Sequence, residues 1–165
     1  MKLRVMTVAV LVALLASFAF APARPAAAQV SIPITGSGPL GTFVGAFDIQ
    51  RFAVQGGQLV AIGTLTGELT NTVTGVVTEI TRQIALPVGV TQATCDILDL
   101  TLGPLDLDLL GLVIHLDQVH LTIDAEQGPG NLLGNLLCAV AGLLDGTPNV
   151  SGLARLLNQI LRILG

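Results

Sequence analysis

Metal-ligating side chains recur near the end of a long alternating stretch. If a one-residue slip at Gln118 is a β-bulge, these side chains share one polar sheet face. Imidazole and carboxylate groups suit Zn²⁺ or another divalent cation, and Asp106 with Asp108 would suit a harder cation. An ordinary solvated face gives the same pattern, so we expect neither a metal nor a cofactor. The candidate ligands are His115, Asp117, His120 and Asp124.

Cys95 and Cys138 are the two cysteines of the chain. In an exported protein an even pair forms a disulfide, which here would join the start of a strand to a helix. The alternative is a pair of buried free thiols. Catalytic redox chemistry requires a close pair or an activating neighbour, and the sequence offers neither. We therefore predict a structural disulfide.

Other catalytic patterns are weak. Gly128, Gly130 and Gly134 resemble the glycine spacing of a dinucleotide-binding turn, but no second βα unit follows. They are better explained as a turn followed by a close helix contact. No lysine occurs after position 2, and Gly36-Ser37-Gly38 is not a nucleophile elbow. We predict no catalytic residue and no enzymatic activity.

The elements that would position these residues divide the chain into two parts. Residues 41–126 alternate between apolar and polar side chains, with a phase slip at Arg51 and a hairpin signal at Gly56-Gly57. Residues 131–164 have the apolar spacing of two helices. The predicted class is α+β: an antiparallel curled sheet or partial barrel with a C-terminal αα hairpin packed on it.

Residues 1–28 have the layout of a signal peptide, with Lys2 and Arg4 before an apolar run and small residues before a cleavage point between Ala28 and Gln29. Residues 29–40 are predicted to be an extended N-terminal arm or an edge strand, and 41–165 one α+β domain. We expect a secreted or extracytoplasmic protein with no membrane span after cleavage.

The charge of the predicted mature chain restricts its partners. Four arginines and eleven acidic residues leave a net charge of −7, and Trp and Tyr are absent. Phosphate backbones and anionic lipid surfaces would repel such a chain. It also lacks aromatic stacking platforms. We expect no nucleic-acid partner, and the composition names neither a protein partner nor an apolar ligand.

Three runs carry a resemblance that extends over nearly the whole predicted mature chain: FAVQGGQLVAIGTLTGELT (52–70), LGPLDLDLLGLVIHLDQVHLTIDA (102–125) and GPGNLLGNLLCAVAGLLDG (128–146). They resemble a family of uncharacterised secreted bacterial proteins whose members are labelled only as hypothetical proteins. The resemblance implies a bacterial exported protein, and it brings no known activity, ligand or catalytic residue.

Three functions follow from these observations. We expect a non-enzymatic structural or interaction module at the cell envelope or outside the cell. The first alternative is a carrier of an apolar small molecule or lipid in a cavity between sheet and helices. The second is a metal-dependent site on the face of His115 and His120.

Overall fold

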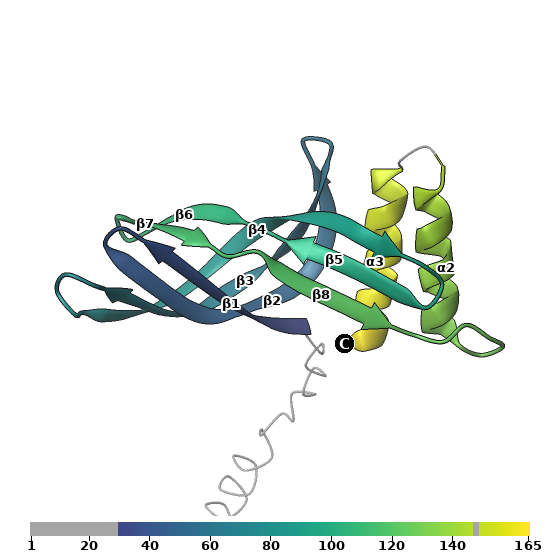
Figure 1. The fold of residues 1–165 in the computed structure, drawn as a ribbon, viewed down its shortest axis with the longest axis horizontal. Coiled ribbons are helices and arrows are strands. Elements are labelled where there is room, and N and C mark those ends of the chain that lie inside the picture. Colours follow the sequence, from purple (N-terminus) through teal and green to yellow (C-terminus); the bar gives the residue numbers. More distant parts are fainter. Residues whose placement is uncertain (1–29, 147–148) are drawn as a thin grey trace, which may run out of the picture.

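The structure is a computed structural model that describes residues 30–146 and 149–165. An antiparallel curled sheet is followed by two helices gathered at one end of it (Figure 1), which confirms the α+β class. The predicted signal peptide and its cleavage point lie outside the described residues. The elements are β1 (Val30–Gly38), β2 (Gly41–Gln55), β3 (Gln58–Asn71), β4 (Val77–Ala93), β5 (Ile97–Leu102), β6 (Leu105–Leu109), β7 (Leu112–Leu116), β8 (Val119–Asp124), α2 (Leu132–Leu144) and α3 (Val150–Leu164).

The sheet has eight strands in the order β6-β7-β1-β2-β3-β4-β5-β8. Strands β5 to β8 form one long bent hairpin, because β6 pairs with β7 and β5 with β8 on either side of a break at residues 103–104 and 117–118. One half of this hairpin pairs through β5 with β4, and the other half pairs through β7 with β1. The hairpin thus links both margins of β1–β4 and curls the sheet into a partial barrel.

The segment predicted as an N-terminal arm is extended but belongs to the sheet. Strand β1 pairs with β2 along its whole length and with β7 near its end. Ile32 and Ile34 are buried in the core. Pro33 and the nearby glycines obscured this alternation in the sequence, because such residues usually mark loops. The domain therefore starts before residue 41.

The two local signals in β2 and β3 are confirmed. The pairing of β2 with β3 shifts register between Ile49 and Arg51, which is the predicted bulge. Gly56 and Gly57 form the turn with φ values of 57° and 80°, the backbone conformation that favours glycine in a two-residue hairpin. Phe43 and Phe47 lie on the buried face, as the alternation predicts.

Paired glycines allow the sheet to curl around its aromatic side chains. Gly45 pairs directly with Gly67. A Cβ on Gly45 would lie 2.1 Å from the carbonyl oxygen of Thr66 and 2.8 Å from the ring of Phe43. The ring of Phe43 therefore covers the backbone at Gly45, where there is no space for a side chain. Covering a glycine with an aromatic ring is a recognised way to bend a strand and protect the glycine.

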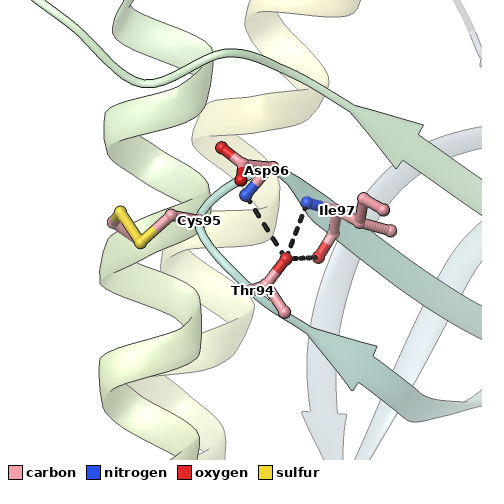
Figure 2. The surroundings of a disulfide bond; sticks show 5 residues. Thr94, Cys95, Asp96 and Ile97 are labelled. Carbon is pink, nitrogen blue, oxygen red and sulfur yellow. Dashed lines mark hydrogen bonds between the residues drawn. A yellow bond between two sulfur atoms is a disulfide. The ribbon is translucent and has the colours of Figure 1, made fainter.

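The disulfide between Cys95 and Cys138 is present, as predicted, and connects residues 43 positions apart. Figure 2 shows Cys95 in the turn between β4 and β5, with its partner on a helix. The Thr94 hydroxyl organises this turn, because it accepts hydrogen bonds from the backbone N–H groups of Asp96 (3.3 Å) and Ile97 (3.0 Å). The bond thus fixes α2, which carries Cys138, to the sheet.

Helix α3 is attached to the sheet differently. Val30, the first residue of β1, pairs with Ile49. Among the described residues, β2 therefore continues past the start of β1. There the side-chain oxygen of Asn158 accepts a hydrogen bond from the Phe52 N–H (2.7 Å), and its amide nitrogen donates to the Phe52 carbonyl (2.8 Å). One side chain of α3 thus makes the two bonds that a neighbouring strand would make.

Each helix start has its own local chemistry. Asn149 caps α3 through a 2.8 Å bond to the Gly152 N–H. Asn131 occupies the N-cap of α2 but makes no side-chain capping bond. Within α2, a Cβ on Gly134 would lie 2.1 Å from the carbonyl oxygen of Glu126. The glycine-rich segment is therefore a turn followed by a close helix contact, as the sequence indicated.

Candidate functional site

The four candidate metal ligands are all exposed, but His115 belongs to one strand pair and His120 and Asp124 to another. Gln118 is not a bulge within a continuous strand, because β7 ends at Leu116 and β8 starts at Val119. Strand β7 pairs with β6 and β1, whereas β8 pairs with β5. The phase slip therefore marks a break between two strands. No group of three or more His, Cys, Asp or Glu side chains suited to a metal occurs in residues 30–146 and 149–165.

Each of these residues has local surroundings of its own. The Nδ1 atom of His115 lies 2.7 Å from a carboxylate oxygen of Asp106, its cross-strand partner. Asp117 accepts a 2.8 Å hydrogen bond from the Thr35 hydroxyl. His120 faces Thr101 across the β5–β8 pair. Asp124, at the end of β8, pairs in register with Ile97.

The His115–Asp106 pair is the most plausible chemical pair, but both side chains are exposed, at 54% and 73%. An exposed side-chain pair of this kind is well solvated and contributes little energy. Cross-strand side-chain pairs stabilise the pairing of neighbouring strands. We therefore assign this pair to the β6–β7 hairpin. Ser37 of β1 pairs in register with His115. The sequence alone did not indicate this neighbour.

The boundary between sheet and helices is hollowed in several places. An open groove of about 500 Å³ lies between β3–β5 and the adjoining ends of α2 and α3, and another of about 460 Å³ lies between the segment after β8 and the start of α2. Where α3 packs against β1, β2, β5 and β8, an apolar cavity has a volume of only about 10 Å³. That is room for about one water molecule. The cavity is lined by apolar side chains of sheet and helix, including Val30, Ile49, Phe52, Leu121, Leu157 and Ile160.

A feature that the sequence analysis did not single out lies at the end of the sheet away from the helices. Figure 1 shows the β1–β2, β3–β4 and β6–β7 turns together there. Seven of the twelve large apolar side chains that are exposed among the described residues belong to these turns and the adjoining strands. We call this set the tip surface: Leu40, Val44, Val73, Val76, Val77, Leu110 and Val113.

Backbone contacts hold the three turns against one another. The N–H of Thr72, in the β3–β4 turn, donates a 3.0 Å hydrogen bond to the carbonyl of Leu40, in the β1–β2 turn. A Cβ on Gly38 would lie 1.9 Å from the carbonyl oxygen of Val113, so the β6–β7 hairpin also lies directly against the β1–β2 turn. The tip surface is thus one continuous end of the molecule rather than three separate loops.

Leu110 is the most unusual residue of this surface. It is 72% exposed and has a φ of 55°, and it is the only non-glycine residue with positive φ in the described ranges. With Gly111 (φ 83°) it forms the turn of the β6–β7 hairpin. Asn, Asp or Gly normally occupies this position. A leucine here is both conformationally strained and exposed, a combination found where function opposes stability.

A sequence signal for this site did exist. Leu110-Gly111 separates two alternating runs at hairpin spacing, so a leucine stands where turn chemistry calls for asparagine. No helix in the described part of the chain is long and apolar enough to cross a membrane. No protein-family model matches the sequence, and comparisons with curated proteins and with solved structures give no match.

Proposed function

We propose that this protein is an exported, non-enzymatic interaction module that attaches to its partner at the cell envelope through the tip surface. The observation that carries the proposal is the exposed, strained Leu110 in one of the three turns that form an apolar end of the molecule. Contiguous exposed apolar surface of this kind commonly marks an interaction site.

The division of the molecule supports this proposal. The helix end carries the disulfide and the Asn158 contact, which hold the helices to the sheet. The opposite end consists of turns whose apolar side chains lack cover within the described chain. A disulfide framework fits an oxidising compartment, and the sequence pattern of residues 1–28 fits export. Stability and contact are therefore assigned to opposite ends.

The test compares retention of the protein at the surface of an exporting bacterium with its release into the medium. Replacing Leu40, Val73 and Leu110 by Ser, Thr and Asn should shift the protein toward the medium. Leu132→Ser is the matched control, because Leu132 is similarly exposed (61%) but lies at the helix end. Equal retention of the triple variant and the wild type would contradict the assignment to the tip surface.

A separate assay addresses the non-enzymatic part of the proposal. The purified exported protein is incubated with a panel of ester, peptide and glycoside substrates. We expect no turnover. Turnover that disappears when His115 or His120 is replaced would refute this part. Elemental analysis after chelation and reloading covers the metal alternative, for which about one bound metal per chain would be required.

The carrier alternative has a different structural requirement. The apolar cavity of about 10 Å³ under α3 is far smaller than a lipid, so a carrier would have to hold its ligand in the open groove of about 500 Å³ between β3–β5 and the ends of α2 and α3. Native mass spectrometry of the exported protein distinguishes the two functions. A stoichiometric apolar ligand would favour the carrier, and an apo mass with intact envelope retention would favour the interaction module.

A further inference from the structure

We infer that the partner of the tip surface is an uncharged lipid–water interface, into which the β1–β2, β3–β4 and β6–β7 turns insert their apolar side chains. This inference rests on the proposed function and specifies its partner. Three observations carry it: the shape of the surface, the residue types in it and the conformation of Leu110.

The shape and charge of the three turns suit a lipid surface. The turns are convex ends of hairpins (Figure 1), whereas peptide partners are commonly bound along grooves or strand edges. Residues 36–42, 70–78 and 109–114 contain no charged residue. The nearest acidic groups, Glu79 and Asp108, lie just behind them in the sequence. The side chain of Asp108 is engaged, since it accepts a 2.8 Å hydrogen bond from the Gly111 N–H.

The residue types distinguish a lipid from a protein partner. Energetically dominant contacts in protein interfaces are enriched in Trp, Tyr and Arg. The tip surface has none of these, since its exposed large side chains are leucines and valines. Insertion into hydrocarbon requires only aliphatic area, and binding strength increases with each buried methylene group. Because the predicted mature chain carries a net charge of −7, a neutral lipid surface is favoured over an anionic one.

The conformation of Leu110 supplies independent support. A positive φ places its side chain at the apex of the hairpin at a cost in stability. An asparagine would relieve the strain and remove the exposed apolar group at once. The protein instead has a leucine at the first of the two turn residues between β6 and β7. Burial of the Leu110 side chain in the lipid-bound state explains why a leucine occupies this position.

The test measures flotation of the exported protein with vesicles of pure phosphatidylcholine. We expect the wild type to bind, Leu110→Asn to bind at least about tenfold more weakly, and the triple variant at Leu40, Val73 and Leu110 more weakly still. Leu132→Ser should bind like the wild type. Addition of anionic lipid should weaken binding by the wild type. Leu110→Asn should also unfold at a higher denaturant concentration, so its weaker binding cannot result from misfolding.

Three outcomes would overturn the lipid inference. The first is absence of wild-type binding to phosphatidylcholine, and the second is equal binding by the triple variant. The third is a dimer in lipid-free buffer that the triple variant abolishes, because the occupant would then be a second copy. If envelope retention still depends on the tip surface in these cases, the proposed function stands and only the lipid partner is wrong. If retention does not depend on it, both fail.

Discussion

Asn158 is expected to be the most important polar side chain for attachment of α3 to the sheet. Its amide satisfies both backbone groups of Phe52, through bonds of 2.7 and 2.8 Å. Phe52 itself is only 6% exposed. Replacement by alanine leaves one donor and one acceptor without these partners in a partly buried position. Each such group costs about 1–3 kcal/mol when fully buried, so for Asn158→Ala we expect a loss of about 2–3 kcal/mol.

Asn158→Asp tests the two hydrogen bonds of Asn158 separately, because it keeps the acceptor and removes the donor. A carboxylate still accepts from the Phe52 N–H, but its second oxygen then faces the Phe52 carbonyl and repels it. We therefore expect this variant to be destabilised at neutral pH. Protonation of the introduced carboxyl restores a donor and stabilises the folded state, so the contribution is present at acidic pH and is lost as the pH rises. The stability gap to the wild type should narrow on acidification.

The assay is equilibrium denaturation with matched denaturant slopes. Gln159→Ala is the control, because Gln159 is the adjacent amide residue of α3 and is exposed. Its effect should be within about 0.5 kcal/mol. If Asn158→Ala costs no more than Gln159→Ala, the two hydrogen bonds do not secure the helix and this reasoning is refuted.

Three further predictions concern stability. Joint replacement of Cys95 and Cys138 by serine should reduce the free energy of unfolding by about 4 kcal/mol, the loop-entropy value for a separation of 43 residues; a loss below about 1 kcal/mol in denaturation would contradict this. Gly134→Ala should destabilise the protein by about 2 kcal/mol because its Cβ meets backbone, whereas Gly142→Ala, in open space in the same helix, should stabilise it by about 0.5–1 kcal/mol; thermal melts that rank the two in the opposite order would contradict the packing. Leu110→Asn should raise stability by about 1 kcal/mol by relieving the positive φ, and an unchanged or lower melting temperature would count against strain at this turn.

Much of the fold was predictable because its signals are local. Alternation identified the buried faces of β2 and β3, the phase slip identified the bulge near Arg51, and paired glycines identified the turn at Gly56. The period change after residue 130 identified both helices. These features depend on near neighbours in the chain, so a single sequence contains the information that determines them.

The phase slip at Gln118 shows where local reasoning fails. A bulge within one strand and a break between two strands give the same one-residue shift in alternation. Only the pairing partners distinguish them, and β7 and β8 pair with different strands. The grouping of His115 with His120 was argued from a bulge, and the structure instead places the two residues in different strand pairs.

The sequence by itself determined the α+β class, the faces of the strands, the two helices and, with the export pattern, the chemistry of the cysteine pair. Only the tertiary structure decided that Asn158 replaces a strand beside Phe52, that the ligand-like side chains lie in separate surroundings, and that three turns far apart in sequence form one apolar end. The physical reason is that periodicity reports which side of an element is buried, whereas proximity between distant segments depends on how the whole sheet curls and closes.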